Sequence, residues 1–292
     1  METITTLSKN TIQSILKKAS IYKQNDTRNT LFQNKIFGLL FFEPSTRTSL
    51  SFESAIHRFG GKIIRYNSQI SSEKKGEDLE DTIKTLDAYV DILIIRHPNK
   101  NIISTIKQYT HKPIINAGNG DGEHPTQALL DLFTIMESFP NFPTKIAFTG
   151  DIKYSRTIHS LLQLLILWNP SMFYYFICDP QLEPPDFILN QLQPNSYSIS
   201  NTLHNDSIKT IDVLYVTRLQ KERFINENVS NIIITKDLLK NSKQNLIIMH
   251  PLPRNDEIPK EFDTDPRSKY FEQVKNGVYV RMAILYHILQ KN

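Results

Sequence analysis

The chain has 292 residues, and its 34 basic and 30 acidic side chains leave a net charge of only +4 at pH 7. Hydrophobic residues make up 39% of it, enough for a sizeable core at this length, so neither disulfides nor a structural metal are needed to hold the fold. The mild, scattered positive charge argues against a duplex-binding face, and a chain of this length predicts two domains.

Features of membrane and secreted proteins are missing from the sequence. The apolar runs, such as residues 164–168 and 173–178, are far shorter than the ~20 residues needed to cross a bilayer. The first residues, METITTLSKNTIQ, lack the basic start and apolar centre of a signal peptide. Cys178 is the only cysteine, and its strand-like surroundings predict a buried bystander. We therefore expect a cytoplasmic protein that binds small anions, with no nucleic acid and no membrane as partner.

An opening amphipathic helix is predicted by four apolar residues that share one helical face: Ile12, Ile15, Leu16 and Ala19. Short apolar runs that are typical of strands then alternate with helical patterns. The expected strands are residues 36–42, 63–66, 91–95 and 113–116, and the expected helices are residues 48–59, 78–89, 101–108 and 125–138. This alternation predicts βαβ units and a parallel sheet covered on both faces.

The stretch SFPNFPTK has two prolines and no periodicity, which predicts a boundary near residue 140. Beyond it we expect strands at residues 145–149, 171–178, 196–200, 212–216 and 246–249, and a final helix at residues 278–289. The prediction is an α/β fold of two domains, residues 1–140 and 141–292, each a parallel sheet flanked by helices. In such sheets ligands bind beyond the carboxyl ends of the strands, so the loops that follow the strands should carry the site.

The stretch PSTRTS follows the first predicted strand. Pro44 cannot donate a ladder hydrogen bond, so strand pairing should end there and a helix should begin just after it. Ser45, Thr46, Arg47 and Thr48 then meet free backbone N–H groups and the positive end of the helix dipole, which favour an anion. Plain helix capping is the alternative, but it uses one hydroxyl and no arginine. We prefer an anion site in which Arg47 grips a phosphate through two parallel bonds.

Two further loops carry polar residues. RHP ends a predicted strand with Arg96, and HPTQ places His124 and Gln127 at a helix start, with Pro125 as a favoured first residue. Taken alone, His124 is more often a capping residue than a catalytic one. The glycines near it lack the spacing of a dinucleotide loop, and no Cys/His ligand cluster is present, so neither a cofactor nor a metal is expected.

Seven motifs, in one order, make the chain similar to aspartate carbamoyltransferase catalytic chains. They are PSTRTS, SxxKKGE (residues 71–77), RHP, HPTQ, KYxRTxHS, TRxQKER and HPLPR, and they cover nearly the whole length. PSTRT and HPTQ are shared with ornithine carbamoyltransferases, but those enzymes typically carry HCLP in place of the last motif. The resemblance implies the aspartate/ornithine carbamoyltransferase-like fold, with residues 1–140 binding carbamoyl phosphate, residues 141–292 binding aspartate, and the C-terminal helix packing back near the first domain.

The resemblance also implies an activity and its residues. The enzyme would transfer the carbamoyl group from carbamoyl phosphate to the amine of L-aspartate, giving N-carbamoyl-L-aspartate and phosphate in de novo pyrimidine biosynthesis. The residues implied for carbamoyl phosphate are Ser45, Thr46, Arg47, Thr48, Ser71, Lys75, Arg96, His124 and Gln127. Those implied for aspartate are Lys75, Arg156, Arg218, Gln220 and the main-chain carbonyls of Leu252 and Pro253. The catalytic residues among them would be Arg47, Thr48, Lys75, Arg96 and His124.

The implied partners are like subunits. The resemblance implies a homotrimer in which the loop with Ser71 and Lys75 reaches the neighbouring active site, and it leaves open whether a regulatory chain binds.

The chain departs from the family pattern at two places. Ser155 stands where the family usually has glycine, so a positive φ there would cost stability and displace Arg156. The segment after Arg223 is also shorter than its counterparts, which bears on domain closure.

Two alternative functions are a transcarbamylase for another amine, such as ornithine, and an inactive scaffold paralogue. The scaffold is disfavoured because every phosphate-loop and lysine-loop position is filled.

Overall fold

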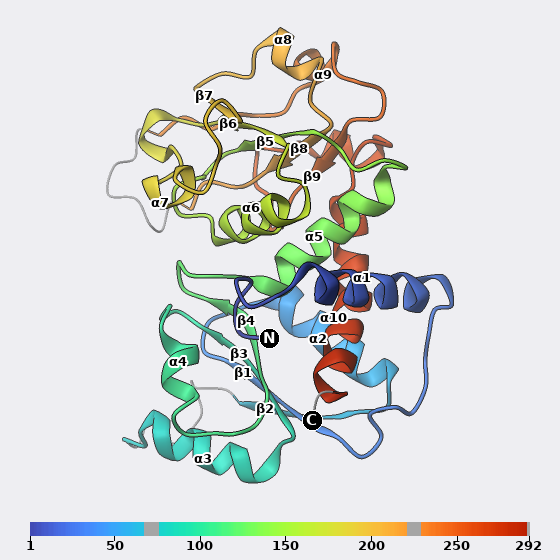
Figure 1. Cartoon of the computed structure of the whole chain (residues 1–292), viewed down its shortest axis with the longest axis vertical. Coiled ribbons are helices and arrows are strands. Elements are labelled where there is room, and N and C mark those ends of the chain that lie inside the picture. Colours follow the sequence, from blue (N-terminus) through green and yellow to red (C-terminus); the bar gives the residue numbers. More distant parts are fainter. Residues whose placement is uncertain (67–75, 221–228, 291–292) are drawn as a thin grey trace. The chain divides into compact units, whose positions relative to one another are not determined.

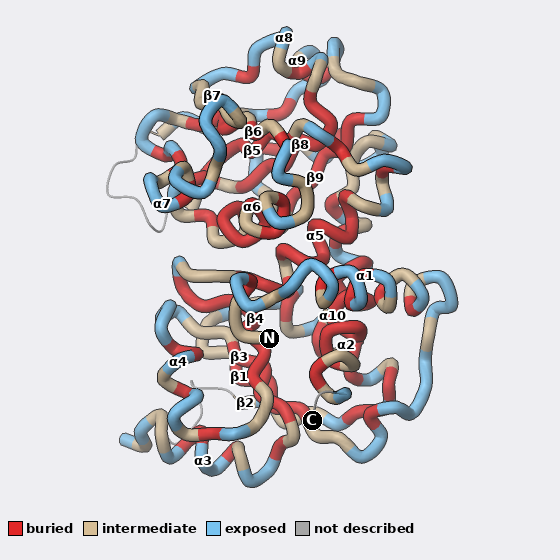
Figure 2. The backbone as a smooth tube through the Cα atoms, in the orientation of Figure 1, coloured by how far each residue is buried: buried red, intermediate tan, exposed pale blue. Residues whose placement is uncertain are grey.

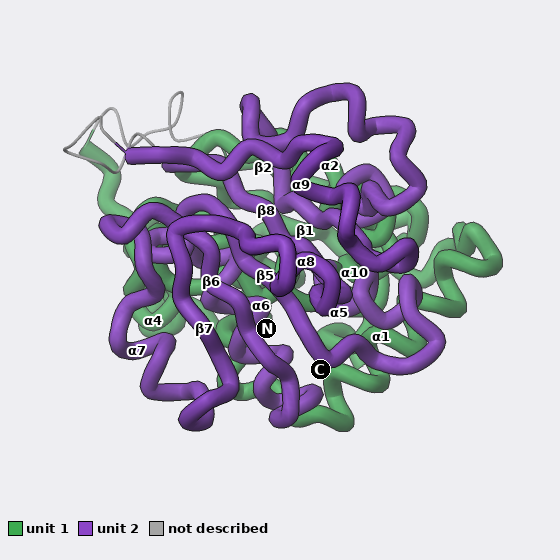
Figure 3. The backbone as a smooth tube through the Cα atoms, turned by 90° about the horizontal axis from the view of Figure 1, so that it is seen from above, with its two compact units in different colours: residues 1–130, 274–292 green, residues 131–273 purple. Residues whose placement is uncertain are grey.

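The structure is a computed structural model that describes residues 1–66, 76–220 and 229–290. Contacts divide the chain into two compact units, residues 1–130 with 274–292 (unit 1) and residues 131–273 (unit 2) (Figure 3). Each unit has a parallel sheet of its own, which confirms the predicted two-domain α/β fold. No helix in the described part of the chain combines the length and apolar character that crossing a bilayer requires.

Unit 1 is built on a four-stranded parallel sheet. Its strands are β1 (Ile36–Phe41), β2 (Lys62–Tyr66), β3 (Ile92–His97) and β4 (Ile114–Asn119), in the spatial order β2-β1-β3-β4. Its helices are α1 (Lys9–Gln24), α2 (Thr46–Arg58), α3 (Leu79–Tyr89), α4 (Ile102–Ile106), the start of α5 (Pro125–Ser138) and the end of α10 (Tyr270–Leu289). The chain thus leaves β1 toward one edge of the sheet and returns to β3 on the other side of β1, which makes the space between β1 and β3 a topological switch point.

Unit 2 repeats this arrangement with five parallel strands. They are β5 (Lys145–Thr149), β6 (Phe173–Ile177), β7 (Tyr197–Ser200), β8 (Val213–Val216) and β9 (Ile247–Met249), in the order β7-β6-β5-β8-β9. Its helical elements include α6 (Arg156–Trp168), η3 (Pro180–Leu182), α7 (Asp186–Leu189), α8 (Asn205–Ile208), α9 (Lys236–Leu239) and η5 (Lys260–Thr264). The strand order reverses between β5 and β8, so the second switch point lies there.

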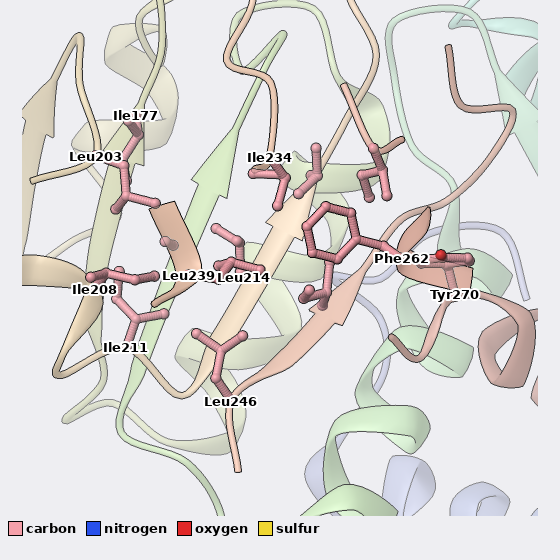
Figure 4. Close-up of a cluster of buried hydrophobic side chains, with 14 residues drawn as sticks. Ile177, Leu203, Ile208, Ile211, Leu214, Ile234, Leu239, Leu246, Phe262 and Tyr270 are labelled. Carbon is pink, nitrogen blue, oxygen red and sulfur yellow. The ribbon is translucent and has the colours of Figure 1, made fainter. Parts of the chain in front are cut away.

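Much of both sheets is buried, as the red stretches of the backbone in Figure 2 show. All four residues of β8 are buried, as are the first four of β3, which is typical of parallel strands covered on both faces. A cluster of 14 buried side chains packs against β5, β8 and β9, with Leu214, Leu246 and Phe262 among its members (Figure 4). In unit 1, the predicted inner face of α1 is confirmed, because all four apolar residues are at most 2% exposed.

The observed elements differ from the predicted ones at particular ends. α10 begins at Tyr270, eight residues before the predicted start. The prediction missed these first turns because Gln273 and Asn276 are buried polar residues that interrupt the apolar pattern of the helix. The Asn276 side chain accepts a hydrogen bond from Lys23 at 2.8 Å, and Gln273 donates to Asp131 at 2.8 Å. The helix predicted at residues 101–108 is the shorter α4, Ile102–Ile106, and its N-terminal residue Asn101 makes no side-chain capping bond within the described residues.

Candidate active site

Each switch point is flanked by loops that carry predicted site residues (Figure 1). In unit 1, the loop after β1 ends at Ser45, residues 46–48 form the first turn of α2, and β3 ends with Arg96 and His97. In unit 2, the loop after β5 leads to Arg156, and the loop after β8 carries Arg218. Since ligands of open α/β sheets bind outside the carboxyl ends of strands at such points, the fold itself selects these loops.

In the part of the chain that the structure describes, the N-terminus of α2 has no side-chain cap, unlike those of α1 and α3. Ser45 occupies the N-cap position with φ −157°, yet its hydroxyl makes no capping hydrogen bond within the described residues. By contrast, Ser8 and Asp78 each accept a hydrogen bond from the N–H three residues further on, at 3.1 and 2.8 Å. Thr46 and Arg47, which follow Ser45, are exposed. This geometry favours the anion site over plain capping, because the first-turn N–H groups keep their capacity for an anion.

Arg96 joins the loop after β1 to strand β4. Its Nε lies 2.8 Å from Oε1 of Glu43, in the loop after β1, and its side chain is only 14% exposed. On the other side, an Arg96 guanidinium N–H donates to the carbonyl of Ala117 in β4 at 3.5 Å. The strand register also places Arg96 opposite Phe41, the last residue of β1. A cation is therefore held at the switch point, beside the start of α2.

The loop that leads to His124 is fixed by its own backbone contacts. Gly120 has φ +50°, and a Cβ there would lie 2.2 Å from the carbonyl oxygen of Pro98, so glycine is required. Gly120 donates its N–H to the carbonyl of His97 at 2.8 Å, which ties this loop to the end of β3. His124 then directly precedes α5 and is only 4% exposed, while Gln127 on the first turn is half-buried.

Glu123 anchors the same loop from its other side. Its carboxylate accepts hydrogen bonds from the Thr3 hydroxyl at 2.6 Å and from the Ile4 N–H at 2.7 Å. Its backbone N–H donates to the side chain of Asn119, the last residue of β4, at 2.8 Å. The backbone directly before His124 is thus held from two directions.

In unit 1, seven of the predicted residues lie at or just beyond the carboxyl ends of the strands: Ser45, Thr46, Arg47, Thr48, Arg96, His124 and Gln127. Thr48 is the most deeply placed hydroxyl of its loop, at 5% exposure. The predicted roles of Ser71 and Lys75 lie outside the described residues.

In unit 2, the loops after β5 and β8 touch closely. Gly150 has φ +98°, and a Cβ there would lie 2.1 Å from the carbonyl oxygen of Thr217, so only glycine permits this approach. The next residue, Asp151, is fully buried. Its carboxylate accepts from the Tyr154 N–H at 2.9 Å and from the side-chain amide of Gln220 at 2.9 Å. One buried carboxylate thus joins the two loops that carry predicted aspartate-binding residues.

Ser155 fits its position without strain. Its φ is −82°, so Ser155 does not have the positive φ that a glycine position in the family suggested. The serine is the N-cap of α6. Its hydroxyl accepts from the Ile158 N–H at 3.4 Å. Arg156 is therefore the first residue of a capped helix, and it is half-buried. Arg218 is half-buried as well, and its guanidinium donates to the carbonyl of Leu219 at 3.1 Å.

The HPLPR segment follows β9, the neighbour of β8. Leu252 has φ +52°, and the peptide bond between it and Pro253 is cis. The Leu252 N–H donates to Nδ1 of His250 at 2.8 Å. His250 itself is 1% exposed, whereas Leu252 is half-buried and Pro253 is exposed. The carbonyls of Leu252 and Pro253 therefore lie in an irregular loop beyond the carboxyl ends of the strands, as do Arg156, Arg218 and Gln220.

Sequence reasoning missed the residues that hold these loops. Asp151 comes directly after a strand and a glycine, a position that could have identified it as a loop anchor. Glu43 offered no such signal, because its pairing with Arg96 depends on which strands are neighbours. Cys178 was correctly predicted as buried: it is 2% exposed, and burial raises the pKa of its thiol to about 12.

Comparison with known proteins defines the class to which this α/β fold and its two switch-point sites belong. Residues 1–137 match the family described as aspartate/ornithine carbamoyltransferase, carbamoyl-P binding domain, and residues 143–288 match its Asp/Orn binding domain. The chain belongs to the aspartate/ornithine carbamoyltransferase family, as its motifs predicted.

Individual relatives resemble it over most of their length. The aspartate carbamoyltransferase catalytic subunit of Alkaliphilus oremlandii is 44% identical, over 96% of this chain and 87% of its own. That of Vibrio campbellii is 40% identical, over 98% and 94%. Among solved structures, aspartate transcarbamoylase from Trypanosoma cruzi in complex with N-(phosphonacetyl)-L-aspartic acid is 38% identical, with a TM-score of 0.92 over 98% of this chain and 94% of that one. The fold is thus that of aspartate carbamoyltransferases.

Proposed function

We propose that this protein is an enzyme that transfers the carbamoyl group of carbamoyl phosphate to the amine of L-aspartate, giving N-carbamoyl-L-aspartate and phosphate for pyrimidine synthesis. The observation that carries the proposal is the pair of switch-point sites, each rich in cations or amide donors. Solved relatives from Trypanosoma cruzi, described as complexes with carbamoyl phosphate and with carbamoyl aspartate and phosphate, support it.

Unit 1 supplies the phosphate and carbonyl contacts. The first turn of α2 and Arg47 bind the phosphate, because backbone N–H groups and a guanidinium fork match its oxygens. Thr48, Arg96 and His124 donate to the carbamoyl oxygen. As the amine attacks, negative charge develops on that oxygen, so these donors stabilise the transition state more than the ground state. Gln127 holds the carbamoyl amide.

Arg96 is positioned by Glu43, since its Nε lies 2.8 Å from Oε1 of that carboxylate. Carbamoyl phosphate is negatively charged, so it competes with the Glu43 carboxylate for the guanidinium of Arg96. The Glu43 pair thus holds Arg96 in place at the switch point, at some cost in the free energy of substrate binding.

Unit 2 supplies the acceptor site. Arg156, Arg218 and Gln220 bind the two carboxylates of aspartate, and the carbonyls of Leu252 and Pro253 accept from its α-amine. Orienting the amine requires hydrogen-bond acceptors, and an irregular loop can direct two main-chain carbonyls to one point. Ornithine fits less well, because its side-chain cation would meet Arg218 at a position built for a carboxylate.

The proposal extends to assembly and location. The loop with Ser71 and Lys75 enters the active site of a neighbouring subunit in a homotrimer, and a closed ring of like subunits makes three shared sites. The first domain, residues 1–140, binds carbamoyl phosphate, and the second, residues 141–292, binds aspartate. The enzyme acts in the cytoplasm, and amino-acid binding belongs to its second domain. A regulatory chain is an additional partner to test by co-purification.

Steady-state kinetics with carbamoyl phosphate and a panel of amines tests the proposal. We expect turnover with L-aspartate and none above background with ornithine. Turnover of ornithine with none of aspartate would favour the alternative acceptor, and no turnover with any amine would favour the inactive scaffold.

A further inference from the structure

His250 and Glu257 form a buried pair beneath the irregular loop that follows β9. Both side chains are 1% exposed, and His250 Nε2 lies 2.9 Å from Oε1 of Glu257. Burying polar groups of this kind costs free energy of folding unless they are hydrogen-bonded. The hydrogen bonds of this pair lead to the loop after β9.

The backbone of this loop is held in a conformation that leucine rarely adopts. Leu252 has φ +52°, in the left-handed region where a Cβ is disfavoured. Such conformations persist only when surrounding contacts determine them, and they cluster at functional sites. The contact that holds Leu252 is a hydrogen bond from its N–H to Nδ1 of His250, at 2.8 Å.

This contact fixes the tautomer of His250. The Leu252 N–H is a donor, so Nδ1 must be the unprotonated acceptor, and the proton lies on Nε2, which donates to Glu257. Oε1 of Glu257 accepts a second hydrogen bond from the Asn255 N–H at 2.9 Å. Glu257 thereby holds both the histidine and the far side of the loop, three residues beyond Leu252.

Further contacts fix the pair in unit 2. The Glu257 carbonyl accepts from the Ile234 N–H at 2.9 Å, and the His250 N–H donates to the side chain of Gln273 at 2.8 Å. Burial raises the pKa of the Glu257 carboxyl, but the hydrogen bonds from His250 and Asn255 outweigh it and hold the pKa below its ordinary value. The carboxylate is therefore ionised at neutral pH and remains an acceptor.

We propose that His250 and Glu257 are positioning residues that fix the Leu252 and Pro253 carbonyls for the acceptor amine. The imidazole sets the direction of the Leu252 peptide group, and Glu257 sets the tautomer and orientation of the imidazole. This inference rests on the proposed function, since it assigns those carbonyls to the amine of the acceptor.

Two substitutions of His250 separate positioning from stability. His250→Asn keeps an acceptor near the Nδ1 position for Leu252 but loses the donor to Glu257. His250→Gln keeps a donor near the Nε2 position for Glu257 but offers Leu252 no acceptor. We expect His250→Gln to lower kcat/KM for aspartate by about tenfold or more, and His250→Asn by less than about threefold.

The stability ranking should run the other way. His250→Asn leaves a buried ionised Glu257 without its donor and should have the lower unfolding midpoint. A residue that only stabilises the fold would lower activity in the order in which it lowers stability. Asp212→Asn is the matched control: Asp212 is a nearly buried acid of unit 2 that accepts from Lys243 at 2.6 Å, at the opposite end of β8. It should lose stability while KM for aspartate stays unchanged.

A second measurement does not depend on turnover. In ¹⁵N-labelled enzyme, the His250 ring, assigned by its loss in His250→Gln, should show protonated Nε2 and unprotonated Nδ1 at neutral pH. Protonated Nδ1, or equal kcat/KM for the two His250 variants, would overturn the positioning role. The proposed function fails by a different result, namely no carbamoylation of aspartate by the unsubstituted enzyme.

Discussion

Gln220 donates a hydrogen bond from its side-chain amide to Oδ2 of Asp151 over 2.9 Å, which ties the loop after β8 to the loop after β5. Oδ1 of the same carboxylate accepts from the Tyr154 N–H, two residues before Arg156. Asp151 is fully buried, so these bonds form in a low-dielectric environment. The proposed acceptor site of unit 2 would therefore depend on a residue that does not itself need to touch aspartate.

Asp151→Ala should raise KM for aspartate by about tenfold or more, because Gln220 and the turn before Arg156 lose their common anchor, a loss of ~1.5–3 kcal/mol. Asp151→Asn keeps one acceptor oxygen for the turn and should have a smaller effect. Steady-state kinetics with aspartate as the varied substrate measures both. An unchanged KM in a folded Asp151→Ala enzyme would show that the anchor has no part in acceptor binding.

The two units should respond differently to the loss of an arginine. Arg218→Ala should weaken aspartate use with little effect on carbamoyl phosphate, whereas Arg47→Ala should weaken phosphate binding and also lower kcat. Removing one partner of a buried charge pair commonly costs ~2–5 kcal/mol, so the effects should be large. Lys153→Ala, an exposed cation in the same loop as Arg156, is the control for net charge. The assignment is wrong if Arg218→Ala abolishes phosphate binding and spares aspartate dependence.

Acid should destabilise unit 2 through Asp263. Hydrogen bonds from Arg254 and Tyr270 lower the pKa of this carboxyl from 3.8 to about 2. Because the folded-state pKa is depressed, its contribution to stability is complete above pH ~4 and is lost as pH falls through ~2. Asp263→Asn should therefore lose less unfolding free energy than the parent chain between these values in urea titrations. Asp237→Asn, at an exposed position, is the control. Identical pH dependence in Asp263→Asn and the parent would contradict this.

The sequence predicted the parallel sheets well because their strands are short, apolar and buried on both faces. β5 was predicted at its observed limits, residues 145–149, and Pro125 marked the first residue of α5. The end of β1 and the start of α2 were also predicted from local rules, since a proline after a strand and hydroxyls at a helix start act within a few residues. Contacts between loops were beyond such rules. The Arg96–Glu43 and Gln220–Asp151 pairs follow from strand order, so neither pairing has a local signal.

Complementation tests the shared active site. Lys75→Ala and His124→Ala oligomers should each be nearly inactive, because each lacks one half of every site. After dissociation and mixed reassembly, activity should return, since some interfaces pair an intact loop with an intact pocket. Mass spectrometry should confirm the mixed oligomers. If they form and stay as inactive as either parent, the two residues act within one subunit.

Isotope labelling tests most directly whether the carbamoyl group of carbamoyl phosphate is transferred to the amine of aspartate. The enzyme is incubated with ¹³C-carbamoyl phosphate and an equal mixture of ¹⁵N-labelled aspartate and α-¹⁵N,δ-¹⁵N-labelled ornithine, and the product is examined by ¹³C NMR. The account predicts one carbamoyl resonance, split by ¹⁵N and belonging to N-carbamoyl-L-aspartate, with phosphate released in equal amount. A ¹³C–¹⁵N product formed from ornithine, or phosphate release without any such product, would contradict it.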